Sequence, residues 1–303
     1  LGRIHSAGDA LRCFLEAREA GFRNISCDIM SALPGQTAEG FERTLRRMAE
    51  LGPEHISAYS LIIEEGTAFH RIYRWDSPAL SPALPDEETE REMYHRTQRV
   101  LAEYGYARYE ISSYARPGRE CAHNIGYWTG HQYLGMGLAA ASLVRDGAGW
   151  RRFVNTRNIE WYLERYLHEE CGVSPAQPVC SSAAKSGNEE CGLPPAQPAC
   201  SSAAQPGHVR GWADGLNQLR EEDTFLMAKD RMEEFMFLGL RLAGGIREAR
   251  FASLFGREFR DVYGALAEKQ EAQGLLCRRD GRIFLSDYGN DVSNRVMAEY
   301  LLD

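Results

Sequence analysis

The first 63 residues alternate between helical and strand patterns, and this alternation limits the folds open to the chain. Apolar residues recur at helical spacing over residues 9–20 and 38–51, whereas residues 24–30 and 55–63 are short apolar runs suited to strands. Only short turns separate these segments. The order helix, strand, helix, strand predicts an α/β fold with a parallel sheet, in which ligands bind at the carboxyl ends of the strands.

One charged residue, Asp28, interrupts the first predicted strand. Burying a carboxylate among apolar side chains is costly unless the carboxylate has a partner. Two interpretations stay open from the residues alone. Asp28 forms an ion pair or caps a neighbouring loop, or it contacts a ligand.

The rest of the sequence predicts further helices and hairpins. The expected elements are a helix over 85–106, a strand over 107–115, a hairpin turning at Asp146–Gly147, a helix over 221–245, and helix, helix, hairpin, helix over 247–302. This last order resembles a winged-helix module, which often binds DNA. Residues 231–303 carry 11 Lys and Arg against 12 Asp and Glu, however, so the basic surface of a nucleic-acid-binding domain is lacking.

Residues 169–208 consist of one twenty-residue unit and its near copy, EECGVSPAQPVCSSAAKSGN and EECGLPPAQPACSSAAQPGH. The composition is rich in Pro, Ser, Ala and Gly, and it supplies too few large apolar side chains to form a core. The four cysteines are spaced nine or more positions apart, wider than the two to four residues favoured by local zinc sites. We therefore expect a disordered insertion over residues 169–210 and no metal site.

Composition excludes several classes of protein. The formal net charge of −8 at pH 7 disfavours broad binding to phosphate backbones. No apolar run approaches the roughly 20 residues that span a bilayer, and we expect no signal peptide. None of the eight cysteines forms a CxxC or CxxxC group, so we interpret them as reduced thiols of a cytoplasmic protein.

The segment RECAHNIGYW, residues 119–128, is rich in polar and ring-bearing side chains, and we predict that it is a loop. A run rich in glycine and alanine, YLGMGLAAAS, follows it and would let a backbone or a flat ligand approach closely. Three interpretations are open from the residues: a packed corner of the fold, a metal site, or a surface that grips a flat cofactor.

Several segments in fixed order resemble the radical-SAM haem chaperones, the HemW family, which are similar to oxygen-independent coproporphyrinogen III oxidases. These segments are GFRNISCDIMSALPGQT, PEHISAYSLIIEEGT, the run from LPDEETERE to HNIGYW, and EEFMFLGLRLAGG. The resemblance covers almost the whole chain except residues 169–208. Ser31 and Ala32 depart from it, because family members usually have an aromatic residue and a glycine there.

The resemblance implies a division of the chain into four parts. They are the C-terminal part of a radical-SAM partial (β/α) barrel at 1–115, a connecting region with the HNIGYW motif at 116–168, the insertion at 169–210, and a small winged-helix-like α+β domain at 211–303. Family members bind a [4Fe–4S] cluster through a CxxxCxxC loop, and one iron holds S-adenosylmethionine (SAM). This sequence has no such loop, so we expect a fragment without the N-terminal half, marginally stable and inactive in radical chemistry by itself.

The HNIGYW segment fits the HNxxYW motif of the haem chaperones, which implies that His123, Asn124, Tyr127 and Trp128 bind haem. A neutral imidazole from His123 suits iron, Asn124 can orient that ring or a propionate, and the two large rings offer flat faces. The structural alternative is a corner in which His123 bonds a backbone carbonyl and Trp128 fills the core. Cys121 could supply a thiolate ligand, but we expect an inert thiol.

Three further positions match a SAM site of the related oxidases, namely Arg3, Asp28 and Ile62. Arg3 can pair with a carboxylate through two hydrogen bonds, and Asp28 can accept from ribose hydroxyls or an ammonium group. The alternative is an internal Arg3–Asp28 ion pair that braces the strand ends.

The resemblance therefore predicts a haem chaperone that carries haem to acceptor apoproteins, with SAM and [4Fe–4S] acting in the full-length form. Its predicted partners are haem and those apoproteins, with no nucleic acid, no transmembrane segment, and contact with a membrane surface left open. The alternatives are a coproporphyrinogen III oxidase of porphyrin biosynthesis and a non-catalytic remnant that docks a partner.

Overall fold

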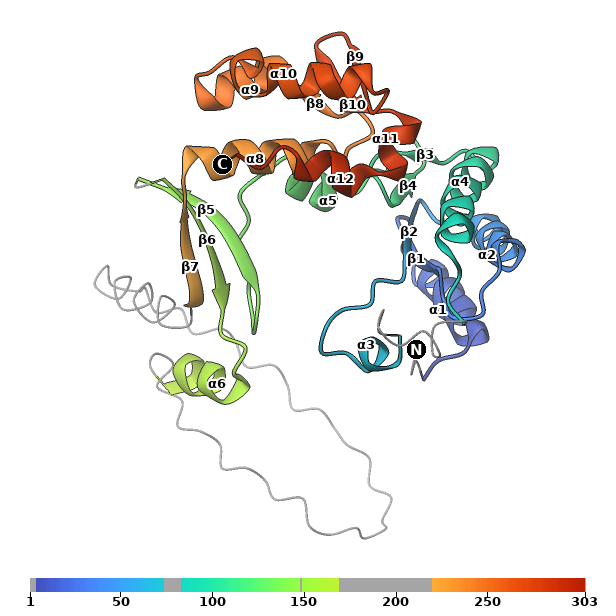
Figure 1. Cartoon of the computed structure of the whole chain (residues 1–303). Coiled ribbons are helices and arrows are strands. Elements are labelled where there is room, and N and C mark those ends of the chain that lie inside the picture. The colour runs from blue at the N-terminus through green and yellow to red at the C-terminus, as the bar shows by residue number, and fades with distance from the viewer. Residues whose placement is uncertain (1–3, 74–82, 148, 169–219, 303) are drawn as a thin grey trace. The chain divides into compact units, whose positions relative to one another are not determined.

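The computed structural model describes residues 4–73, 83–147, 149–168 and 220–302 (Figure 1). The chain divides into two compact units, one made of residues 1–131 and 228–303 and the other of residues 132–227. The four-part division expected from the sequence stays a prediction.

The first unit opens with the predicted alternation of helices and strands. Its first elements are α1 (Ala7–Glu19), β1 (Ser26–Ser31), α2 (Ala38–Glu50) and β2 (His55–Ser60). The side chains of Ser6 and Thr37 cap the two helices by accepting hydrogen bonds from backbone amides. Because β1 and β2 pair in parallel, the α/β pattern predicted for this part of the chain is confirmed.

The parallel arrangement does not continue past β2. The next elements are α3 (Ala68–Ile72), α4 (Glu87–Glu103), β3 (Ala107–Arg108) and β4 (Ser113–Ala115). β4 is antiparallel to both β2 and β3, and the sheet order is β1-β2-β4-β3. The prediction of one strand over 107–115 is therefore wrong. The chain turns between β3 and β4, where the Tyr109 N–H donates to the Ser113 carbonyl at 3.1 Å.

The two faces of this sheet differ in chemistry. Ile29, Ile56 and Tyr114 belong to one buried apolar cluster with Phe41 of α2 and Met93 of α4. Successive side chains of a strand point to opposite faces, so the alternate residues form the other face. That other face carries the polar residues Ser26, Asp28, His55, Ser57 and Ser113.

Residues 228–303 complete the first unit with short strands and helices. The described elements are α8 (Ala228–Gly239), β8 (Ile246–Arg247), α9 (Glu248–Phe255), α10 (Phe259–Ala272), β9 (Leu276–Arg279), β10 (Arg282–Leu285), α11 (Asp287–Asp291) and α12 (Ser293–Ala298). The three strands form an antiparallel sheet in the order β8-β10-β9. The predicted order helix, helix, hairpin, helix is confirmed, except that the last helix is divided at Val292.

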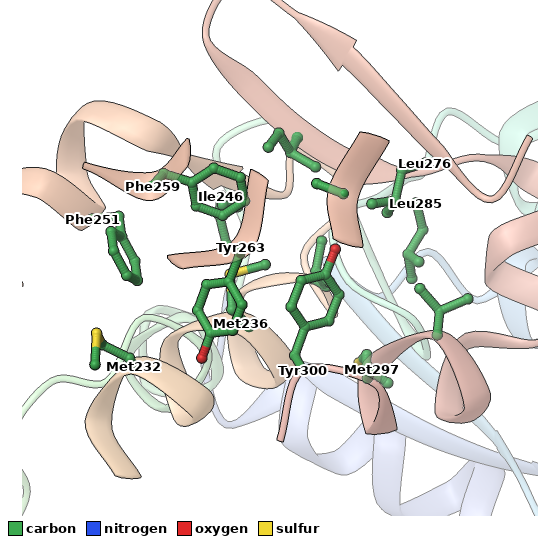
Figure 2. Close-up of a cluster of buried hydrophobic side chains, with 14 residues drawn as sticks. Met232, Met236, Ile246, Phe251, Phe259, Tyr263, Leu276, Leu285, Met297 and Tyr300 are labelled. Atoms are coloured by element: carbon green, nitrogen blue, oxygen red, sulfur yellow. The ribbon is translucent and has the colours of Figure 1, made fainter. Parts of the chain in front are cut away.

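A single apolar core holds these C-terminal elements together. Figure 2 shows Met232 and Met236 of α8 facing Phe251, Phe259 and Tyr263 across this core. The Phe251 ring is fully buried and contacts four other aromatic rings at centroid distances of 4.8–5.8 Å. Such tilted and edge-to-face pairs add to the stabilisation given by burial alone.

The described residues of the second unit form a three-stranded antiparallel sheet and the helix α6. Its elements are β5 (Ala141–Asp146), β6 (Gly149–Asn155), α6 (Ile159–His168) and β7 (Arg220–Leu226), with the strand order β5-β6-β7. The predicted hairpin at Asp146–Gly147 is confirmed. The duplicated segment 169–208 and the rest of the expected insertion, up to residue 210, lie outside the described residues.

The helix predicted over 221–245 is wrong at both ends. Residues 220–226 pair with β6 as a strand, and α8 begins only at Ala228 and ends at Gly239. The pairing is supported by the Arg151 guanidinium, which donates to the Asp223 carboxylate at 2.8 Å across the two strands. The sequence could not reveal this partner, because about seventy positions separate the two residues in the chain.

In the part of the chain that the structure describes, no helix has both the length and the apolar character needed to cross a membrane.

Replacing Phe251 by Ala should destabilise the first unit strongly. Truncation of a fully buried Phe costs about 3–5 kcal/mol of unfolding free energy. Leu254→Ala is the matched control, because Leu254 lies on the same helix and is 54% exposed. Urea denaturation followed by circular dichroism should show a change below about 0.5 kcal/mol for this control. Equal losses for the two variants would contradict the assignment of Phe251 to the core.

Candidate functional site

The HNIGYW segment is a helix, so the prediction that it is a loop is wrong. Helix α5 spans Ala122–Trp128, and Cys121 stands at its N-cap without a side-chain hydrogen bond. The Ile125 N–H donates to the Cys121 carbonyl at 3.0 Å, and this is the first hydrogen bond of the helix. A helix of seven residues is far shorter than the roughly 12–15 residues that are marginally stable in water. α5 must therefore be held by contacts with the rest of the unit.

The spacing of the motif separates its four side chains into two pairs on α5. Residues four apart on a helix are neighbours on one side of it. His123 and Tyr127 form an exposed pair whose rings meet edge to face, with centroids 4.7 Å apart. Asn124 and Trp128 form the second pair, and both are half-buried. The motif thus combines one pair exposed to solvent with another that attaches the helix.

Asn124 attaches α5 to the polar face of the sheet through a series of hydrogen bonds. Its Nδ2 donates to the Tyr109 hydroxyl at 3.5 Å, and this hydroxyl lies 2.8 Å from Nε2 of His55. The other ring nitrogen of His55, Nδ1, lies 2.8 Å from the Ser26 hydroxyl. The sequence alone does not single out His55 or Tyr109 as site residues, because only the fold brings them beside the motif.

The proton positions in this series are linked to one another. The Tyr109 oxygen accepts from Asn124 Nδ2. If its own proton is donated to Nε2 of His55, the His55 ring proton lies on Nδ1 and is donated to Ser26, and the other tautomer reverses both of these hydrogen bonds. Burial lowers the pKa of His55, and the nearby carboxylates of Asp28 and Glu110 act in the opposite direction. His55 is 5% exposed and neutral near pH 7.

Trp128 attaches the other end of α5 to the C-terminal residues of the first unit. The Arg241 guanidinium lies over the Trp128 ring at 4.4 Å from its centroid. Arg231 donates to the Gly130 carbonyl at 3.2 Å, and Arg250 donates to the Thr129 carbonyl at 3.3 Å. Cations suit the C-terminal end of a helix, where backbone carbonyls lack partners.

The residues proposed for a SAM site are only partly described. Asp28 is exposed on the polar face of the sheet, next to Ser57 in the register of β1 and β2. Ile62 lies two positions past β2 and is 76% exposed. Arg3 lies outside the described residues, so an Arg3–Asp28 ion pair stays a prediction. Because Asp28 reaches solvent, its charge in the strand needs no buried partner.

The described cysteines do not point to a metal centre. Cys121 is half-buried at the start of α5, and burial raises the pKa of the Cys27 thiol to about 11. In the described ranges, no three His, Cys, Asp or Glu side chains are placed to hold a metal ion together. Cys171, Cys180, Cys191 and Cys200 of the duplicated segment lie outside those ranges.

The glycine-rich run that follows the motif belongs to the second unit. A Cβ on Gly135 would collide with the Ala141 carbonyl oxygen, so only glycine allows this close backbone approach. Asn155 Nδ2 donates to the Gly137 carbonyl at 2.8 Å and fixes the loop. Met136, between the two glycines, is exposed to solvent.

Comparison with known proteins relates this chain to the HemN and HemW proteins. Residues 226–291 match the HemN C-terminal domain family. The chain is 30% identical to the heme chaperone HemW of Lactococcus lactis over 100% of its own length and 65% of that protein. For the heme chaperone HemW of Bacillus subtilis the identity is 29% over 99% of this chain and 65% of the relative. The chain thus spans 65% of the length of these curated relatives.

A solved structure shows the same fold. Coproporphyrinogen III oxidase (HemN) from Escherichia coli, described as a radical SAM enzyme, superposes with a TM-score of 0.65. It is 16% identical, and the match covers 99% of this chain and 59% of that one. The α/β and C-terminal parts therefore share the fold of a radical SAM enzyme.

The buried, neutral state of His55 should make stability depend on pH. A folded-state pKa below the ordinary 6.5 means that the unfolded chain binds a proton more readily. The free energy of unfolding should therefore fall as pH decreases from about 6.5 through the folded pKa. The loss is about 1.4 kcal/mol for each tenfold difference in proton affinity between the unfolded and folded chains.

His55→Gln should remove this part of the pH dependence in urea denaturation between about pH 5 and pH 8. The exposed His5→Gln is the control and should keep it. An unchanged pH dependence in His55→Gln would contradict the assignment of His55 as a buried neutral imidazole.

Proposed function

We propose that this chain, a relative of the haem chaperones HemW along its whole length, binds haem on helix α5 and passes it to acceptor apoproteins. The observation that carries the proposal is the pair His123 and Tyr127, which stands exposed on a helix held from its other side. An exposed imidazole can reach an iron centre without any rearrangement of the core. The adjacent Tyr127 ring offers a flat apolar surface beside that iron.

The two attached residues, Asn124 and Trp128, have a different role in this proposal. The sequence suggests that Asn124 orients the imidazole or a propionate, but its amide is engaged by Tyr109. Trp128 is held under Arg241. Both therefore support the haem site by keeping α5 folded, and His123 is its iron ligand.

The same proposal includes the parts of the fold that the sequence suggested. We take β1, β2 and their helices as the C-terminal part of a partial (β/α) barrel, and residues 228–303 as a winged-helix-like domain. Asp28 and Ile62 lie on or near the polar face of the sheet and are exposed, which supports a SAM site there with Arg3. The cytoplasmic location expected from the cysteine pattern belongs to this proposal as well.

A [4Fe–4S] cluster does not fit the residues that the structure describes. No group of three potential ligands is present among them, so no step is assigned to a cluster in this chain. The iron–sulfur chemistry implied by the family is proposed only for a form of the protein that carries the CxxxCxxC loop.

A haem titration followed by absorbance tests the function directly. Addition of ferric haem to the chain should give a Soret shift that saturates, because His123 supplies an axial ligand. His123→Ala should weaken binding at least tenfold, a loss of about 1.4 kcal/mol. The matched control is His131→Ala, another exposed histidine three residues beyond the motif, which should bind as the unaltered chain does. Equal spectra and affinities for all three proteins would contradict the role of His123.

A further inference from the structure

Three arginines form one row across the sheet β8-β10-β9. In the antiparallel register, Arg282 of β10 lies opposite Arg279 of β9 on one side and opposite Arg247 of β8 on the other. Directly opposite residues of neighbouring strands point to the same face of a sheet, with Cβ atoms about 4.5–5.5 Å apart. This arginine row therefore places three positive charges next to one another over about 10 Å.

The arginine row lies on the face of the sheet that is turned away from the apolar core. Ile246 and Ile283 are the register pair next to it, and both belong to the buried cluster of this region. Because successive side chains of a strand point to opposite faces, Arg247 and Arg282 point away from that cluster. Arg247 and Arg279 are exposed, and Arg282 is half-buried. The row is therefore accessible from solvent.

The charges of the row are not compensated within the described residues. No carboxylate there forms an ion pair with any of its three guanidinium groups, and this includes Asp280 in the turn between β9 and β10. Arg278 of the same hairpin shows the contrast, because it belongs to the other face and pairs with Glu271 at 2.8 Å and with Glu248. Like charges directly opposite one another in a sheet are destabilising. The fold thus neutralises one arginine of the hairpin and leaves the adjacent row at a cost in stability.

The middle arginine of the row is held in position by the backbone. Nη1 of Arg282 donates to the Gly244 carbonyl at 3.2 Å, and a Cβ on Gly244 would lie 3.3 Å from that nitrogen. This hydrogen bond uses one of the five N–H donors of a guanidinium. Nε and Nη2 have no acceptor among the described residues, and both reach solvent. A donor group that is fixed before its partner arrives loses less entropy on binding.

The spacing of the row fits the carboxylates on one side of a helix. Residues three or four apart on a helix have Cβ atoms about 5–6 Å apart, which is close to the distance between neighbouring strands. Glutamates at i, i+4 and i+8 can therefore place one carboxylate at each arginine. Each guanidinium can bind a carboxylate through two parallel hydrogen bonds. A nucleic acid fits less well, because its binding needs basic charge spread over many phosphates, and residues 231–303 carry 11 Lys and Arg against 12 Asp and Glu.

We propose that the arginine row binds an acidic helix of a partner protein, whose carboxylates recur at every third or fourth residue. The proposal does not rest on haem binding at α5. It assigns the sheet β8-β10-β9 a role as a docking surface for a protein. The repulsion within the row is then the cost of a contact that forms only with the partner.

Fluorescence anisotropy with two labelled alanine-based helical peptides tests this docking. One peptide carries Glu at i, i+4 and i+8, and the other carries Gln at the same positions. The unaltered chain should bind the Glu peptide at least about tenfold more tightly than the Gln peptide. Raising the salt concentration from about 0.1 M to about 1 M should remove most of this preference. The triple variant Arg247→Gln, Arg279→Gln, Arg282→Gln should lose the preference.

The matched control is the triple variant Arg257→Gln, Arg260→Gln, Arg295→Gln. These three arginines are exposed, belong to the same region and lie outside β8, β9 and β10, so both triple variants change the net charge equally. The control should keep the full preference for the Glu peptide. Equal losses for the two triple variants would mean that only net charge matters, and would overturn the proposal.

Two further measurements decide between this proposal and other roles of the row. A labelled single-stranded oligonucleotide should bind more weakly than the Glu peptide, and tighter binding that depends on the row would overturn the proposal in favour of a nucleic-acid partner. No binding of the Glu peptide by the unaltered chain would overturn it as well.

Urea denaturation separates docking from a structural role. Because the row variant removes adjacent like charges, its free energy of unfolding should equal or exceed that of the unaltered chain. A clear decrease would mean that the row supports the fold, against the proposal. Arg279→Gln alone, on the exposed edge strand β9, should keep the fold and lose part of the preference for the Glu peptide. An unchanged preference in Arg279→Gln would also contradict the proposal.

Discussion

The arrangement around the HNIGYW motif depends on one constraint, which is that α5 is too short to be stable by itself. Seven residues, without a side-chain cap at Cys121, cannot offset the unfavourable nucleation of a helix in water. The helix persists because Asn124 and Trp128, four positions apart, are engaged by Tyr109 and Arg241. His123 and Tyr127, also four positions apart, lie on a different side of α5 and are exposed. The helical period therefore explains both why one pair holds the helix in place and why the other pair reaches solvent.

Tyr109 connects the parts of the first unit that meet at this helix. Its hydroxyl joins α5 to His55 on the sheet, and its backbone carbonyl joins the sheet to the turn that follows α8. The parallel register of β1 and β2 sets Ser26 beside His55, so the series of hydrogen bonds ends on the polar face of the sheet. A buried neutral imidazole can continue such a series, because one ring nitrogen donates while the other accepts. Fully satisfied buried networks of this kind favour one arrangement of the surrounding elements.

Local signals predicted much of the fold, and long-range pairing accounts for what they missed. The helical period indicates α1, α2, α4, α9 and α10, and the capping Thr37 marks the start of α2, because these features act within a few positions. The pairing of residues 220–226 with β6 leaves no local trace, so the sequence predicts a helix there. α5 reads as a loop because it is short, contains Gly126 and has no cap. His123 and Tyr127 can be selected from the motif, whereas His55 and Arg241 cannot, because only the folded chain brings them to α5.

A crystal structure of the chain with ferric haem would show most directly whether the exposed pair of α5 forms the haem site. We expect electron density for haem with its iron on the imidazole of His123 and its ring along Tyr127. In that structure Asn124 and Trp128 should keep their contacts with Tyr109 and Arg241, since they hold α5 in place. Haem bound away from α5, or bound with α5 unfolded and Trp128 released from Arg241, would contradict the division of the motif into an exposed pair and an attached pair.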